Sequence, residues 1–308
     1  MTKDITFEDV TIQKNSGEYL HGRIMGHRDS TRAKRLVFIS PLAGSGASLQ
    51  IITFRNFIKR DCKIMSFEYS GHNKSSGTFN LEKSLEDTSV ALQWASNYTR
   101  NENIPLHTMS TCYGTISLLS TFKDGENKCG VKTISAVSGL FQMDRILKYD
   151  EFLPIYSKYD SRQVRTANEF LDLIAKDKIN FNSGSFRDAI ELYLKMVFPT
   201  LRVGKNYFEE LNYARTDIKE TLLQTRLLNP LSKLNVPKEL SSHFFFGLRD
   251  NVLGLVNPIE RDKYFQCVKK IMPSAEIYTA DIDHFGRGPD HDKVIDKLCD
   301  IFEENDRK

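Results

Sequence analysis

Strand-like and helix-like runs alternate along most of the chain. Residues 5–13 and 19–26 are strand-like and flank Asn15-Ser16-Gly17, a combination typical of a β-hairpin. The run 36–39 is continuously apolar, as in a strand that is buried on both faces of a parallel sheet. Five more strands are predicted at 64–67, 106–109, 131–137, 244–248 and 276–280.

Helix-like segments separate these strands. Residues 81–98 carry apolar side chains at helical spacing, and further helices are predicted at 49–59, from Thr115 onward and at 291–304. This alternation of strand and helix predicts an α/β fold with a mostly parallel central sheet and helices on both of its faces.

The alternation stops between residues 142 and 234, where only helix-like segments occur. We therefore expect a core made of residues 1–141 and 235–308, interrupted by a helical cap at 142–234. At 308 residues the chain is long enough for one large domain with such an insertion.

Composition and charge narrow the function class. A hydrophobic share of 40% and a charged share of 27% are ordinary for a globular protein. The net charge of +3, without a basic and aromatic cluster, argues against nucleic-acid binding. No apolar run is long enough for a membrane span, and the first residues lack a secretory signal. The five scattered cysteines have no CxxC spacing, so we expect a reduced, cytoplasmic protein without a metal or a cofactor.

The most informative motif is the pentapeptide Ser110-Thr111-Cys112-Tyr113-Gly114, which lies between a predicted strand and a predicted helix. Small residues two before and two after a central nucleophile are required by a very sharp strand-to-helix turn. Such a turn holds the central side chain in a strained conformation that projects from the sheet. Most proteins with this turn have Ser there, whereas this chain has Cys.

Two further candidates follow later strands. Asp250 comes after the strand at 244–248, and His284 comes after the strand at 276–280. Functional groups gather at the carboxyl ends of parallel strands, and the order nucleophile, acid, base is that of α/β-hydrolases. The sequence therefore predicts a Cys112–His284–Asp250 triad, with Asp144 as the alternative acid.

An acyl-transfer site also needs donors for a tetrahedral oxyanion. The backbone N–H of Tyr113, directly after the nucleophile, is one expected donor. We expect the second at Leu42, in the glycine-rich loop 41–46 that follows the first buried strand.

With the three triad residues in this order, the chain resembles α/β-hydrolases. The motif around Cys112, the segment Ser75-Ser76-Gly77 after a strand, the helical insertion and the overall length resemble, more narrowly, the lux-type acyl transferases (acyl-carrier-protein thioesterases) of luminous bacteria. The resemblance implies a thioesterase that releases fatty acyl groups from acyl carrier protein or acyl-CoA through an acyl-enzyme. It assigns the nucleophile to Cys112, the acid to Asp250 and the base to His284. Cys112 departs from that family, whose nucleophile is Ser.

A cysteine nucleophile has two chemical consequences. Beside an imidazolium, a thiol ionises well below its ordinary pKa of about 8.5, so a resting thiolate–imidazolium pair is expected. Transfer from a carrier thioester to Cys112 exchanges one thioester for another, so the acyl group remains activated for water or another acceptor. We therefore expect a thioesterase or acyltransferase that acts on fatty or polyketide-like thioesters.

Two alternatives remain open on the sequence. One is a small-ester or lactone hydrolase that uses Cys112, and the other is a ligand receptor that keeps the fold without catalysis. The sequence leaves open the acyl chain, the acceptor, the carrier, the oligomeric state and whether Cys112 replaced a natural Ser.

Overall fold

The computed structural model describes residues 4–42, 46–122, 124–141, 236–237, 239–250 and 253–308. The predicted cap at 142–234 and the alternative acid Asp144 lie outside these residues.

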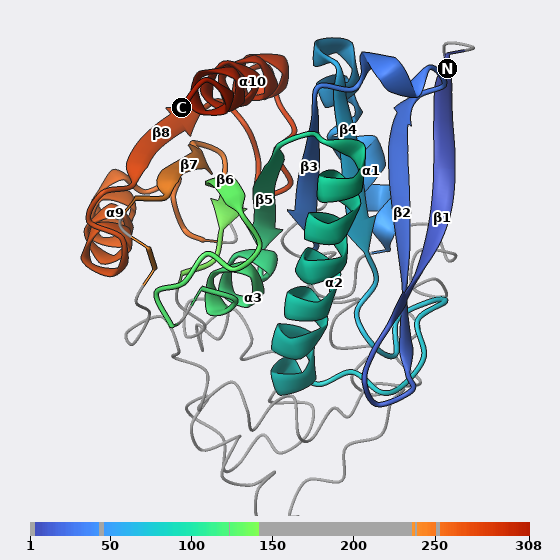
Figure 1. The fold of residues 1–308 in the computed structure, drawn as a ribbon. Coiled ribbons are helices and arrows are strands. Elements are labelled where there is room, and N and C mark those ends of the chain that lie inside the picture. Colours follow the sequence, from blue (N-terminus) through green and yellow to red (C-terminus); the bar gives the residue numbers. More distant parts are fainter. Residues whose placement is uncertain (1–3, 43–45, 123, 142–235, 238, 251–252) are drawn as a thin grey trace, which may run out of the picture.

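An eight-stranded sheet with the order β1-β2-β4-β3-β5-β6-β7-β8 forms the centre of the described structure (Figure 1). The predicted hairpin is present, with β1 and β2 paired antiparallel, and β2 also pairs antiparallel with β4. All other neighbouring strands are parallel, which confirms the mostly parallel sheet. The strands are β1 (Ile5–Gln13), β2 (Tyr19–His27), β3 (Arg35–Ser40), β4 (Cys62–Phe67), β5 (Leu106–Cys112), β6 (Val131–Gly139), β7 (Ser241–Gly247) and β8 (Glu276–Ala280).

Helices connect the strands and cover the sheet. The described ones are η1 (Ser30–Arg32), α1 (Ala47–Thr53), η2 (Arg55–Arg60), α2 (Leu81–Glu102), α3 (Gly114–Ser120), α9 (Pro258–Ile271) and α10 (His291–Asp306). The helix predicted at 49–59 is divided, because Phe54 leaves helical geometry at φ −104° and ψ 20° and a 3₁₀ helix follows.

The α9 helix was not predicted. Only Tyr264 and Val268 of its residues are buried, so it lacks a wide apolar stripe. A start signal was nevertheless present, because Asn257 caps the helix through its side chain and Pro258 occupies the first turn.

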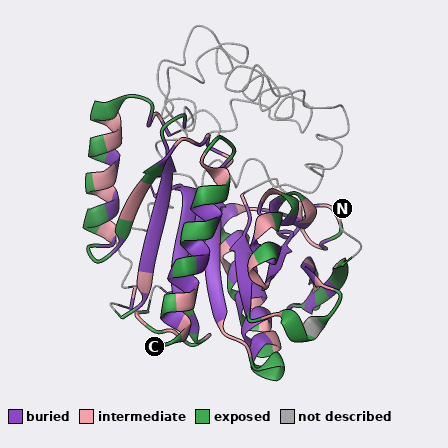
Figure 2. Ribbon diagram, turned by 90° about the horizontal axis from the view of Figure 1, so that it is seen from above, coloured by how far each residue is buried: buried purple, intermediate pink, exposed green. Residues whose placement is uncertain are grey.

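The strands separate two apolar layers. Leu36 and Phe38 of β3 pack with α2, α3 and α9 on one face, whereas Val37 and Ile39 pack with α1, η2 and α10 on the other. This alternation follows from the two-residue period of a strand, and it confirms helices on both faces. Figure 2 shows the consequence, with buried strands between helices whose outer surfaces are exposed.

Candidate active site

The predicted strained turn is present at the end of β5. Cys112 has φ +47°, in the left-handed region that non-glycine residues rarely adopt. A Cβ atom at Gly114 would lie 2.3 Å from the carbonyl oxygen of Ser40 and 2.6 Å from that of Pro41, so only glycine fits. The small side chain of Ser110 is fully buried and lies 3.0 Å from the Thr115 hydroxyl. The turn therefore holds the half-buried Cys112 thiol in one fixed position.

The loops after β7 and β8 bring Asp250 and His284 together. His284 Nδ1 lies 2.9 Å from Asp250 Oδ2, and both side chains are buried. Asp250 Oδ1 also accepts a hydrogen bond of 2.9 Å from the backbone N–H of Leu253. Backbone hydrogen bonds from Leu248 to Ala280 and from Arg249 to Ile282 join the two loops. The carboxylate thereby fixes the orientation of the imidazole ring.

The second ring nitrogen of His284, Nε2, is also buried and, within the described part of the chain, has no hydrogen-bond partner. Burial by itself lowers the pKa of His284, but the negative charges of Asp250 and Cys112 outweigh this effect and raise the pKa well above its ordinary value. Cys112 therefore lies near enough to His284 to influence the pKa of the imidazole.

The two expected oxyanion donors lie on adjacent pieces of backbone. The close approach of Gly114 to Ser40 and Pro41 places the turn after Cys112 against the loop that contains Leu42. The Tyr69 hydroxyl donates a hydrogen bond of 2.9 Å to the Pro41 carbonyl and lies 2.9 Å from the Ser117 hydroxyl. A buried hydrogen-bond network therefore holds this loop beside the nucleophile.

The side chain of Tyr113 has a structural role. It is buried, and its hydroxyl lies 2.6 Å from the Ser84 hydroxyl. Burial raises the pKa of Tyr113, so the phenol stays neutral. Only the backbone of Tyr113 is therefore a candidate for oxyanion binding.

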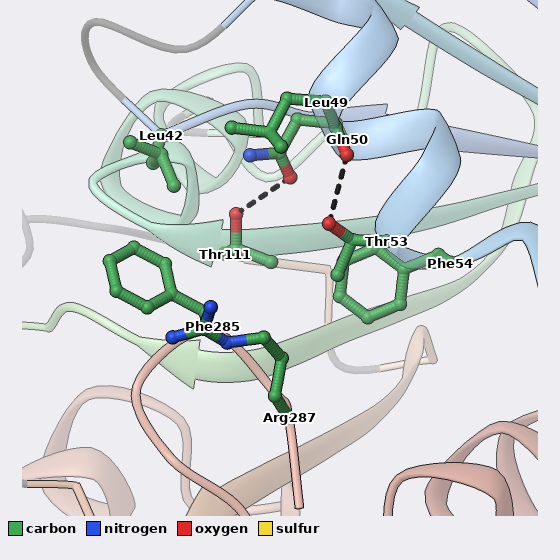
Figure 3. Close-up of a pocket in the computed structure, with 8 residues that line it drawn as sticks. All are labelled: Leu42, Leu49, Gln50, Thr53, Phe54, Thr111, Phe285 and Arg287. Carbon is green, nitrogen blue, oxygen red and sulfur yellow. Dashed lines mark hydrogen bonds between the residues drawn. The ribbon is translucent and has the colours of Figure 1, made fainter. Parts of the chain in front are cut away.

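A cavity of about 140 Å³ lies beside these residues (Figure 3). Its apolar walls are Leu42, Leu49, Phe54 and Phe285. Its polar lining consists of Gln50, Thr53, Thr111 and Arg287. Thr111 precedes Cys112 and Phe285 follows His284, so the cavity borders the candidate triad. None of the three triad residues is part of its lining.

Sequence reasoning missed this cavity. Gln50 and Thr53 lie on a predicted helix, and no pattern along the chain indicates that they face residues of β5. Figure 3 shows the α1 side chains on one side of the cavity and Phe285 and Arg287 on the other. The lining comes from four separate segments, so only the folded chain brings it together.

Neither a metal site nor a membrane helix is found among the described residues. No group of three or more His, Cys, Asp or Glu side chains in this part of the chain is placed to hold a metal ion. No helix there combines the length and the apolar character that crossing a bilayer requires.

Comparisons with known proteins place this geometry in a fold family. No protein-family model matches the sequence, and no curated protein matches it. Solved structures do match. A protein from Burkholderia cenocepacia described as an aryl esterase superposes with a TM-score of 0.62 at 14% identity, over 98% of this chain and 100% of that one. Monoglyceride lipase from Saccharomyces cerevisiae matches with a TM-score of 0.60 at 10% identity, over 99% and 97% of the two chains. A carboxyl esterase from Bacillus coagulans matches with a TM-score of 0.59 at 11% identity, over 97% of this chain and 98% of that one.

The chain has the α/β-hydrolase fold. In this chain, Cys112 is the residue on the sharp turn at the end of β5. Identities of 10–14% establish the fold and leave the reaction to be argued from the site.

Proposed function

We propose that this protein is an acyl-transfer enzyme that takes an acyl group from a thioester or activated ester onto Cys112 and then passes it to water or another acceptor. The observation that carries the proposal is the buried pair of His284 and Asp250, in which Nδ1 lies 2.9 Å from Oδ2. Asp250 and Cys112 both raise the pKa of His284 against the lowering effect of its burial. The φ of +47° at Cys112 supports the proposal, because backbone strain of this kind is concentrated at functional sites.

The first half-reaction forms the acyl-enzyme. The Cys112 thiolate attacks the acyl carbonyl carbon, so a new C–S bond forms and the carbonyl oxygen becomes an oxyanion. The backbone N–H groups of Tyr113 and Leu42 stabilise this oxyanion. The bond to the leaving group then breaks, and the Nε2–H of His284 gives its proton to the departing sulfur or oxygen. Asp250 stabilises the imidazolium before that transfer and holds the ring in position.

The second half-reaction releases the acyl group. Neutral His284 takes a proton from water or another acceptor through Nε2, and the acceptor attacks the acyl-Cys112 carbonyl. The C–S bond breaks, which restores the thiolate and the imidazolium. Because acyl-Cys112 is itself a thioester, it retains the driving force for transfer to an amine, alcohol or thiol as well as to water.

The resemblance to lux-type acyl transferases supports acyl carrier protein or acyl-CoA as the donor, with residues 142–234 as a cap over the acyl group. A second candidate, a Cys-dependent hydrolase of small esters, is favoured by the cavity of about 140 Å³, which is small for a ligand site. Both candidates share the acyl-Cys112 intermediate.

Intact-protein mass spectrometry after brief exposure to hexanoyl-CoA tests the intermediate. The wild-type protein is expected to gain one hexanoyl group, and Cys112→Ala is expected to gain none. Cys129→Ala is the matched control, because Cys129 is another half-buried free thiol, on the loop between α3 and β6. An adduct that persists in Cys112→Ala would show that the nucleophile is another residue.

The receptor alternative is tested with the same variants. A non-catalytic receptor would bind an acyl thioester without an adduct, and its Cys112 would react with iodoacetamide at neutral pH no faster than Cys129. Faster alkylation of Cys112 together with turnover would exclude the receptor.

A further inference from the structure

We infer that the cavity beside Cys112 is the acyl subsite, and that it takes a compact acyl group of roughly six non-hydrogen atoms that carries a hydroxyl. This inference rests on the proposed acyl-Cys112 chemistry and assigns its substrate class. The inference is drawn from the volume of the cavity and from the polarity of its lining, and the triad residues determine neither of these.

The position of the cavity fits an acyl group attached to Cys112. Thr111 lines it from the residue before the nucleophile, and Phe285 lines it from the residue after His284. Leu42, the second expected oxyanion donor, forms another wall. On this basis we place the acyl group of acyl-Cys112 in this cavity.

The volume sets the size of the group. A cavity of about 150 Å³ in another protein holds one benzene molecule, whereas sites for drug-sized ligands measure roughly 300–1,000 Å³. At about 140 Å³ this cavity accommodates a short or aromatic acyl group and is too small for a long fatty chain.

The lining specifies a hydroxyl on that group. The Thr111 hydroxyl donates to Gln50 Oε1 at 3.1 Å, and the Thr53 hydroxyl donates to the Leu49 carbonyl at 2.8 Å (Figure 3). Each hydroxyl has used its one proton, so each oxygen presents lone pairs as an acceptor. A ligand hydroxyl donates to such an oxygen, whereas a hydrocarbon would cover these polar groups without replacing their contacts with water.

Arg287 supplies donors at the other side of the cavity. Its Nε and Nη2 lie 3.1 and 2.9 Å from Asp283 Oδ2, and its guanidinium lies 5.0 Å from the centre of the Phe285 ring. Because Arg287 already pairs with Asp283, we expect it to bind a neutral oxygen in preference to a second anion. A hydroxyl accepts from Arg287 and donates to a threonine oxygen, so it matches both sides of the cavity.

The size is tested with coenzyme A thioesters that differ only in the acyl chain: acetyl, butanoyl, hexanoyl and dodecanoyl. The wild-type kcat/KM is expected to peak at butanoyl or hexanoyl. Leu49→Ala should shift the peak to longer chains, and Leu49→Trp should lower hexanoyl turnover by roughly tenfold while sparing acetyl. Ile52→Ala is the matched control, because Ile52 lies on the same helix, is also 40% exposed and does not line the cavity. A peak at dodecanoyl, or a profile that Leu49→Trp leaves unchanged, would overturn the inference.

The polarity is tested with the β-hydroxybutanoyl and butanoyl thioesters. Thr111→Val keeps the shape of the side chain and removes the oxygen that accepts from the ligand hydroxyl, so the preference for the hydroxylated chain should fall by roughly tenfold. The same loss should appear in the hydrolysis rate of isolated acyl-Cys112, which no longer contains the leaving group. If the loss appears only in acylation, the cavity holds the leaving group and the inference is wrong. Absence of any Cys112 adduct would instead contradict the proposed function.

Discussion

Replacement of Gly114 by Ala should disable the site while the fold survives. A Cβ atom there would lie 2.3 Å from the Ser40 carbonyl oxygen, about 1 Å closer than the 3.4 Å at which ordinary contact begins. Both contacting carbonyls are backbone atoms of the loop that leads to Leu42, so relief requires a backbone shift of about 1 Å. A misplacement of that size costs roughly 100-fold in rate when it separates reacting groups from their donors.

The protein should remain folded. Overpacking in a core costs about 1–3 kcal/mol, so we expect the free energy of unfolding, measured with urea, to fall by about that amount. The acylation rate of Cys112, measured by stopped-flow release of p-nitrophenol from an activated ester, should fall by roughly 100-fold.

A matched variant separates the local clash from a general effect of the added methyl group. A Cβ at Gly26, on β2, meets only the flexible side chain of Lys63, at 3.1 Å. Gly26→Ala should therefore retain wild-type acylation. If Gly114→Ala acylates as fast as wild type, the backbone contact between the turn and the loop does not control the oxyanion donors, and that part of the reasoning is wrong.

Four further predictions concern charge and hydrogen bonding. Cys112→Ser should lower the pKa of His284, read from its ring-proton NMR shifts, because a negative charge that raises this pKa is lost; an unchanged pKa would contradict the coupling. The pKa of His284 is raised on folding, so its charged form stabilises the wild-type fold fully below about pH 6.5. This contribution is lost as the pH rises through the raised pKa. Urea unfolding at several pH values would detect the loss as a fall in the free energy of unfolding. Lys14→Met should lower the free energy of unfolding by about 3–5 kcal/mol, because it leaves Asp87 buried without the ammonium group that lies 2.6 Å away. Adding Asp87→Asn should recover part of that loss. If neither change is seen, the ion pair contributes nothing to stability. Tyr69→Phe should lower the free energy of unfolding by about 1–3 kcal/mol and slow the acylation of Cys112. Unchanged acylation would show that the Tyr69 hydroxyl does not position the loop that contains Leu42.

The central strands of the sheet were predictable because they are buried on both faces. Every residue of β3 and β4 is buried, so their apolar runs stand out in the sequence. The turn at Cys112 was predictable for a steric reason, since Ser110 and Gly114 have the size that the turn requires.

The parts that were missed depend on contacts between distant segments. The apolar spacing of α1 continues past Phe54, so the change to 3₁₀ geometry leaves no trace in the pattern. The α9 helix buries too few side chains to show a stripe. The cavity requires Gln50, Thr111 and Arg287 to converge from three separate segments, which no local pattern encodes.

The order of the site residues along the chain delays the assembly of the proposed triad during synthesis. His284 is translated 172 residues after Cys112 (284 − 112), which at ribosomal speeds takes roughly 10–30 seconds. Throughout that interval Cys112 has no His284 imidazole beside it. A nascent or prematurely terminated chain therefore lacks the proposed triad, which comes together only once β8 has joined the sheet.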